Sequence, residues 1–318
     1  MDEEDVAFFK TQGLEFKSVI ATGGYGVVYL MYSYKYCMNF AVKTIPKEMF
    51  KESELDCLKM IDDPHIVNLY SFYNFDSFVY MLMEYCPNDL EKLRNSKQDI
   101  SDEELSKYIK DAILGLKACH DRKIAHCDIK PSNFLIDKYG RVKISDFGMS
   151  TIYHDQPKSH TYKGTSVFMS PEILKRNEYN PLKADVWALG VTIYFMATGK
   201  YPFYSEDHRE LQGMIKSGKY DESIIPDENL CLLIKRCLVV NPEERASINE
   251  LCSMPYFMQC SNEIDPEMPR PRQTPANKNL SKRKSLISLQ SMHTKRCTRS
   301  SSIQIINSLS KSSEKFKL

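Results

Sequence analysis

Short runs of apolar and β-branched residues recur at five places between residues 14 and 84, and one charged stretch, Lys47–Met60, interrupts them. Runs of this length predict strands, whereas apolar residues spaced by three or four, as in the charged stretch, predict a helix. We therefore predict a small sheet accompanied by one helix. Its strands are expected at Leu14–Ile20, Val27–Tyr32, Asn39–Thr44, Leu69–Asn74 and Phe78–Glu84.

Beyond Pro87 the pattern becomes mainly helical. Ser101–Glu104 has the form of a capping box, and apolar residues follow it at helical spacing as far as Leu116. The chain thus joins a β-rich first part to a larger helical part, which is an α+β organisation. The other elements predicted here are two short strands, Phe134–Ile136 and Val142–Ile144, and helices at Leu182–Thr198 and Leu230–Leu238.

Charge divides the chain near Cys260. The formal net charge is +1, from 43 basic and 42 acidic residues, but 12 of the basic and only 4 of the acidic residues follow Cys260, which leaves 31 and 38 before it. Residues 261–318 are also rich in Ser and poor in core-forming side chains, which predicts a disordered basic tail. The acidic body argues against nucleic-acid binding by the folded part, whereas the tail could contact anionic partners or remain a solvated extension. Residues 1–13 form a separate acidic segment.

The number and spacing of the cysteines and the length of the apolar stretches indicate in which cellular compartment the protein is expected. Ten cysteines without a C-x-x-C pair favour neither a disulfide framework nor a zinc site. The acidic start, Met1–Asp5, lacks the basic and apolar regions of a leader peptide. The longest apolar stretch, Val186–Thr198, is shorter than the roughly 20 residues that span a bilayer. We therefore expect a cytoplasmic or nuclear protein without a transmembrane segment.

A glycine-rich turn, Ile20–Val28, lies between the first two predicted strands. Glycine lacks a Cβ and permits positive φ, so the backbone N–H groups of such a turn can lie close over a phosphate chain. An ordinary hairpin turn uses glycine for the same conformational reason. This motif alone therefore leaves both interpretations open.

Lys43 ends the apolar run Phe40–Lys43 in the third predicted strand. An ammonium group in an apolar strand is costly unless an anion or a carboxylate pairs with it. Glu54 in the following helix could supply the carboxylate, with Glu52 as a competitor. All three side chains could also be solvated surface charges.

The strongest chemical signal is the sequence His126–Asn133, which is followed by Asp146–Gly148. Asp128, Lys130, Asn133 and Asp146 stand on turns that flank two short strands. These residue types suit a general base, a phosphate clamp and two oxygen ligands for Mg²⁺. Each residue alone is more often a loop residue or a helix cap, but their order and spacing match one reaction.

Taken together, these motifs resemble the catalytic domain of eukaryotic protein kinases, from Leu14 to Phe257. The resemblance implies a bilobal fold, with a small β-rich N-lobe containing one helix and a larger, mainly helical C-lobe. It also implies ATP, Mg²⁺ and protein substrates. Lys130 and Thr165 are typical of the serine/threonine class of protein kinases. The overall character of the sequence resembles the calcium/calmodulin-dependent-kinase-like group. Further residues that match the family are Gly164–Thr165, Ser170–Glu172, Asp185–Gly190 and Arg245.

The resemblance implies a role for each matching residue. Lys43 would bind the α- and β-phosphates and pair with Glu54, and Asp128 would accept the proton of the substrate hydroxyl. Lys130 would steady the γ-phosphate, and Thr165 would lie near the substrate. The implied metal ligands are Asn133 and Asp146, and the implied structural pair is Glu172 with Arg245.

The same resemblance implies an ATP pocket with a hinge after Met83. Val28, Ala41 and Leu135 would enclose the adenine, and Asp89 would lie near the ribose. Ordinary core packing explains such apolar residues equally well. The implied nucleotide-binding residues are Ile20, Ala21, Gly23, Gly26, Val28, Ala41, Lys43, Glu54, Glu84, Cys86, Asp89 and Leu135.

Two departures from the family pattern change the expected behaviour. Ala21 replaces the first glycine of the phosphate loop, which costs little if φ is negative there. Cys127 replaces the arginine that precedes the catalytic aspartate and that holds an activation-loop phosphate. Thr161 stands at the usual phosphosite, so we expect a serine/threonine kinase that does not depend on phosphorylation there. The alternative is a pseudokinase-like scaffold, but all the implied chemical groups are present.

Overall fold

The computed structural model describes residues 1–259 except 24–25, 97–98, 154–156, 160–165 and 177. All of these described residues belong to one compact unit. The tail predicted for residues 261–318 lies outside the described residues.

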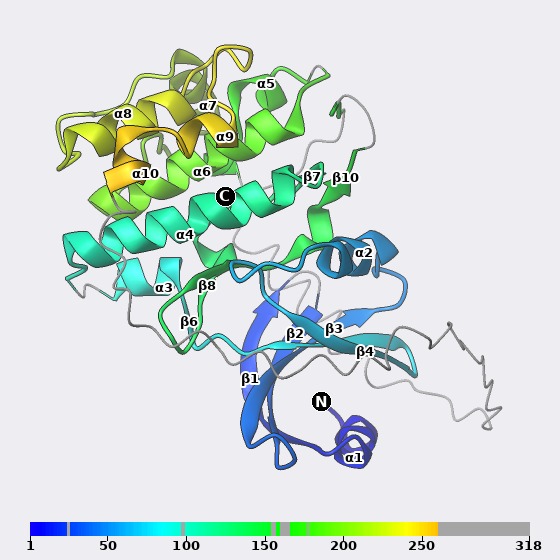
Figure 1. Cartoon of the computed structure of the whole chain (residues 1–318). Coiled ribbons are helices and arrows are strands. Elements are labelled where there is room, and N and C mark those ends of the chain that lie inside the picture. Colours follow the sequence, from blue (N-terminus) through cyan, green and yellow to red (C-terminus); the bar gives the residue numbers. More distant parts are fainter. Residues whose placement is uncertain (24–25, 97–98, 154–156, 160–165, 177, 260–318) are drawn as a thin grey trace. The chain divides into compact units, whose positions relative to one another are not determined.

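A five-stranded antiparallel sheet forms the N-lobe, with strands in the order β1-β2-β3-β5-β4 (Figure 1). All five predicted strands are confirmed. The helix predicted at Lys47–Met60 begins only at Glu52, because residues 47–49 form a separate turn and Lys51 has an extended backbone, with φ of −115° and ψ of 123°. The elements of this lobe after residue 13 are β1 (Leu14–Gly23), β2 (Gly26–Ser33), β3 (Met38–Pro46), α2 (Glu52–Met60), β4 (Leu69–Phe75) and β5 (Phe78–Glu84).

A helix that the sequence analysis missed, α1 (Glu3–Thr11), precedes the sheet. Asp2 caps it in a capping box with Asp5, and the Tyr80 hydroxyl donates to Asp5 Oδ1 at 2.7 Å from strand β5. Phe9 is fully buried in a cluster with side chains of β1, β2, β3 and β5. The segment that appeared only acidic in the sequence therefore forms a helix and contributes Phe9 to the hydrophobic core of the N-lobe.

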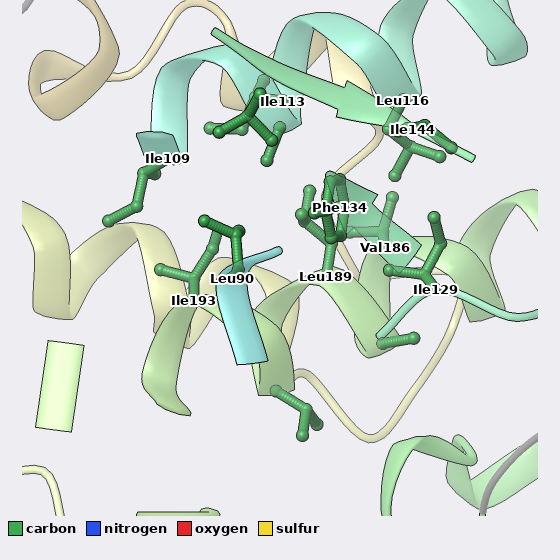
Figure 2. Packing of buried hydrophobic residues seen from close by; sticks show 14 of the residues in the cluster. Leu90, Ile109, Ile113, Leu116, Ile129, Phe134, Ile144, Val186, Leu189 and Ile193 are labelled. Atoms are coloured by element: carbon green, nitrogen blue, oxygen red, sulfur yellow. The ribbon is translucent and has the colours of Figure 1, made fainter. Parts of the chain in front are cut away.

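The C-lobe is mainly helical, as predicted. Its core lies between the long helices α4 and α6 and the short strands β8 and β9, and Figure 2 shows Ile113, Phe134, Ile144 and Leu189 meeting there. Among the described residues, no helix is long and apolar enough to cross a membrane. The helices of this lobe are α3 (Leu90–Asn95), α4 (Asp102–His120), α5 (Pro171–Leu174), α6 (Pro181–Thr198), α7 (His208–Ser217), α8 (Glu228–Cys237), α9 (Ile248–Leu251) and α10 (Pro255–Gln259). Its strands are β6 (Asn88–Asp89), β7 (Ile124–Ala125), β8 (Phe134–Ile136), β9 (Val142–Ile144) and β10 (Thr151–Ile152), and its 3₁₀ turns are η1 (Pro131–Asn133), η2 (Phe147–Met149) and η3 (Ser166–Phe168).

Candidate active site

The glycine-rich turn joins β1 to β2, and its residues 24–25 lie outside the described part of the chain. Gly26 has φ of +147°, and a Cβ there would lie 1.8 Å from the Thr44 carbonyl oxygen. The close pairing of β2 with β3 therefore requires glycine at this position. Ala21 pairs with Val28 in the sheet and is not among the residues with positive φ, so its methyl group is accommodated without strain. Ile20 and Gly23 belong to the same strand, β1.

Lys43 projects from β3 into a double ion pair. Its Nζ lies 2.7 Å from Glu54 Oε1 in α2 and 2.7 Å from Asp146 Oδ1. Glu52 is exposed, so the structure selects Glu54 as the helical partner. The Lys43 and Glu54 side chains are only 13% and 5% exposed, so solvated surface charges are excluded for this pair.

The charges in this cluster stabilise one another. Burial alone lowers the pKa of Lys43, but Asp146 and then Glu54 more than offset this and raise it above its usual range. Burial raises the pKa of Asp146, whereas Lys43 lowers it, and the net shift is downward. Lys43 and Asp146 are therefore charged near neutral pH, which suits a site for a polyanion and a divalent cation.

Asp146 begins the Asp146–Gly148 turn with φ of +63°, a left-handed conformation that is uncommon for a residue with a side chain. Phe147 is fully buried and packs edge-on against the His126 ring, with centroids 5.1 Å apart. A Cβ at Gly148 would lie 3.3 Å from Glu54 Oε2 and 3.4 Å from Asp146 Oδ1. Glycine at this position therefore leaves room for the two carboxylates beside Lys43.

The catalytic loop concentrates polar groups on the carboxylate of Asp128. Lys130 Nζ lies 2.8 Å from Asp128 Oδ2, and Asn133 Nδ2 donates to the same oxygen at 3.0 Å. Asn133 Nδ2 also donates to the Asp128 carbonyl at 2.7 Å. The structure therefore brings these three predicted site residues together around one carboxylate oxygen.

Asp185 holds the backbone of the catalytic loop. Its carboxylate, at the buried start of α6, accepts from the His126 N–H at 2.8 Å and from the Cys127 N–H at 2.9 Å. Cys127 has φ of +63°, so these hydrogen bonds hold it in a conformation that is costly by itself. Asp185 was expected only as part of the family match Asp185–Gly190, although an acidic residue in an apolar run indicates a buried polar partner.

The hinge follows β5. Glu84 Oε2 pairs with the buried Lys143 Nζ at 3.0 Å and accepts from Asn68 Nδ2 at 2.8 Å, so its side chain is engaged within the protein. Val28, Ala41, Cys86 and Leu135 are all partly buried, and the last three pack against the main core. These four positions are therefore compatible with both adenine contact and core packing.

Asp89, which the resemblance places near the ribose, has a structural role in the described part of the chain. It is the N-cap of α3, where Oδ1 accepts from the Lys92 N–H at 2.8 Å and Oδ2 pairs with Lys92 Nζ at 2.9 Å. Asp89 is only 5% exposed. In the structure, Asp89 therefore caps the N-terminus of helix α3.

The residues present fit an Mg²⁺ site that is completed by the nucleotide. Asn133 uses its Nδ2 on Asp128, which leaves the amide oxygen for a cation, and the Asp146 side chain is 35% exposed. Within the described ranges, no three His, Cys, Asp or Glu side chains could hold a metal by themselves. Mg²⁺ commonly takes one or two protein ligands and completes its octahedron with water and phosphate oxygens.

The activation segment, residues 146–172, ends in a buried ion pair. Arg245 Nη1 and Nη2 donate to the two oxygens of Glu172 at 2.7 and 2.9 Å, and the guanidinium lies 5.0 Å from the centre of the Trp187 ring. The predicted pairing of Glu172 with Arg245 is confirmed. Thr161 and Thr165 lie outside the described residues.

A groove with both apolar and polar side chains, among them Arg176, His208 and Gln212, adjoins the end of the activation segment. Met169 and Ile173 line both this groove and a small cavity that Asp128 also borders. Leu211 and Ile215 of α7 form the opposite wall.

Fold and site together define a protein kinase catalytic domain. The sequence profile of the family described as "Protein kinase domain" matches residues 14–257, and the chain belongs to this family.

Curated relatives agree with this assignment. The chain is 31% identical over 222 residues to NUAK family SNF1-like kinase 2 of Homo sapiens, covering 67% of this chain and 35% of that protein. It is 30% identical over 254 residues to CBL-interacting serine/threonine-protein kinase 18 of Arabidopsis thaliana, covering 76% and 49%. It is also 31% identical over 246 residues to the carbon catabolite-derepressing protein kinase of Saccharomyces cerevisiae, covering 75% and 39%.

The matches therefore span between about a third and a half of the relatives' length. They assign the domain to the serine/threonine kinases of the SNF1-like, calcium/calmodulin-dependent-kinase-like group, in agreement with the sequence prediction.

Proposed function

We propose that this chain transfers the γ-phosphoryl group of ATP to serine and threonine hydroxyls of protein substrates. The observation that carries the proposal is the contact of Lys43 with both Glu54 and Asp146, at 2.7 Å each. This contact joins the N-lobe helix, the phosphate-binding lysine and the metal-binding aspartate. The test is transfer of labelled phosphate from ATP to serine, threonine and tyrosine peptides, where transfer to serine or threonine supports the proposal.

In the proposed reaction, the substrate hydroxyl oxygen forms a bond to the γ-phosphorus while the bond from that phosphorus to the ADP oxygen breaks. Asp128 orients the hydroxyl and takes its proton. Lys130 and Lys43 place positive charge near the transferred and the remaining phosphates. When bound, Mg²⁺ neutralises phosphate charge, and Asn133 and Asp146 are the residues that would hold it. The groove beside α7, which has both apolar and polar side chains in its lining, is proposed to receive the protein substrate.

Asp146→Asn is expected to weaken Mg²⁺-dependent ATP binding about tenfold, because a neutral amide replaces one anionic ligand of the cation. Calorimetry with and without Mg²⁺ measures the effect. Affinity in the absence of Mg²⁺ should change much less, and an equal loss under both conditions would contradict a role in metal binding.

Phosphorylation of Thr161 is proposed to be dispensable. Cys127 provides no guanidinium, and Lys158, a basic residue near this site, already lies 2.9 Å from Glu178. We expect the unphosphorylated enzyme to be active and Thr161→Ala to change turnover less than about threefold, because a phosphate there would gain only exposed, flexible contacts. Peptide kinetics of phosphatase-treated wild type and variant measure this. A large loss that an upstream kinase reverses in the wild type alone would refute it.

The basic tail is proposed to contact anionic partners. Residues after Cys260 contain 12 basic and 4 acidic residues, and such clusters attract anionic surfaces. The full chain should bind vesicles that contain phosphatidylserine, and binding should weaken steeply from about 50 to 200 mM salt. A chain ending at residue 260 is the control, and equal binding by both forms would remove the proposal.

A further inference from the structure

The described part of the activation segment forms a backbone bridge to the C-lobe at Ser159. The Ser159 N–H donates to the Tyr179 carbonyl at 2.9 Å, and the Tyr179 N–H donates to the Ser159 carbonyl at 3.1 Å. Beside this bridge, Lys158 Nζ pairs with Glu178 Oε2 at 2.9 Å. The segment is therefore joined to the loop between α5 and α6 by contacts that involve no phosphate.

The bridge lies close to the catalytic loop. Tyr179 is 7% exposed and lines the same small cavity as Cys127 and Asp128. Burial raises the pKa of Tyr179 to about 12, although a hydrogen bond with Ser159 opposes this shift. The phenol is therefore neutral at physiological pH, and the residue beside it, Cys127, adds no fixed positive charge.

The activation segment is also attached to the C-lobe on either side of this bridge. Strand β10 pairs with β7 immediately before the catalytic loop, with Thr151 opposite Ala125 (Figure 1). At the other end, Glu172 is held by Arg245. The Ser159–Tyr179 bridge lies between these two attachments along the sequence. It is the contact nearest in sequence to Thr161 in the described part of the segment.

We propose that the Ser159–Tyr179 bridge is the positioning element that holds the activation segment beside Asp128 in place of a phosphate–arginine contact. The proposal rests on the proposed kinase function and gives a structural basis for its independence from Thr161 phosphorylation. Two reciprocal backbone hydrogen bonds fix both the distance and the direction of the paired segments. They need no charged receiver, which makes them compatible with cysteine at position 127. Ser159 and Tyr179 are positioning residues and do not act on the reacting atoms.

The test uses the full chain, kept unphosphorylated, and two independent measurements. Hydrogen exchange should find the Ser159 and Tyr179 amides protected in the wild type, and this result does not depend on catalytic activity. Ser159→Pro removes the N–H that donates to Tyr179. It should abolish the protection of Tyr179 and lower kcat at least tenfold, while ATP affinity and melting temperature stay near the wild-type values. Ser159→Thr keeps the N–H and the hydroxyl and should retain kcat within threefold.

A charge exchange provides a gentler variant. Lys158→Glu places two acidic residues together at the bridge and should lower kcat about threefold, and adding Glu178→Lys should restore it. Lys175→Glu is the matched control. Lys175 is an exposed lysine of the loop between α5 and α6, which also holds Glu178, but it takes no part in the bridge. This variant should leave kcat unchanged.

Rapid exchange of both amides in the wild type would overturn the proposal, as would a Ser159→Pro enzyme with kcat within threefold of the wild type. If Ser159→Pro loses its fold, failure of the charge exchange to restore kcat would overturn it. A wild-type chain with protected amides and no phosphate transfer would refute the kinase function and, with it, any role of the bridge in positioning for catalysis. Protected amides in an active kinase that still requires Thr161 phosphorylation would refute the proposal that the bridge replaces a phosphate contact. The kinase function would then stand.

Discussion

Asp128→Asn is expected to lower turnover by about 10² to 10⁴, the usual contribution of a positioned acid or base. Asparagine has nearly the same shape as aspartate, and its amide oxygen can still accept from Lys130 or Asn133. It cannot take the proton of the substrate hydroxyl. Steady-state transfer of phosphate to a serine peptide measures kcat, and calorimetry should find ATP binding retained.

Asp121→Asn is a suitable control for this experiment. Asp121 is an exposed aspartate at the end of α4, where it pairs with Lys117. Its replacement should leave kcat within about twofold of the wild type. Equal phosphate transfer by the wild type and Asp128→Asn would contradict the proposed kinase activity. It would favour a domain that binds nucleotide or partners without transferring phosphate.

The sequence was most informative where local chemistry determines structure. Strand runs, capping residues and the Asp128–Asn133 spacing predicted the sheet, the helix α4 and the catalytic loop. The local pattern left Glu52 as a competitor of Glu54, and only the resemblance to the family favoured Glu54. The structure decides between them, because both residues lie in the first turn of α2 and only Glu54 contacts Lys43. The helix pattern alone carries no information on which side chain meets a distant strand.

Other features were unpredictable because they depend on contacts across long stretches of chain. Helix α1 is stabilised by burial of Phe9 against strands that form later, and its own sequence reads as an acidic segment. Asp89 could be a ligand or a helix cap from its position alone, and the contacts with Lys92 favour the cap. The pairing of Ser159 with Tyr179 joins two loops without periodic patterns, so no local rule indicates it.

The pairing of Glu172 with Arg245 should have the largest effect on stability. The Arg245 side chain is fully buried, and Glu172 accepts two of its hydrogen bonds. Glu172→Ala leaves a buried guanidinium without its counter-charge, which typically costs about 3 to 5 kcal/mol. The Lys183 and Val239 carbonyls still accept from Arg245, but neutral oxygens cannot replace a carboxylate. Urea unfolding measures the loss as a lower midpoint at an unchanged slope.

The double variant Glu172→Leu with Arg245→Met distinguishes the stability lost through an unpaired buried charge from the stability lost through poorer packing. Removing both ions leaves no buried charge, and apolar replacements of a buried ion pair are often close to neutral. The double variant should therefore recover at least half of the stability that Glu172→Ala loses. The two carbonyls that lose Arg245 and the ring of Trp187 that loses its cation limit the recovery. A double variant no more stable than Glu172→Ala would mean that the pair acts through packing and hydrogen bonding, and that charge compensation contributes little to anchoring the activation segment.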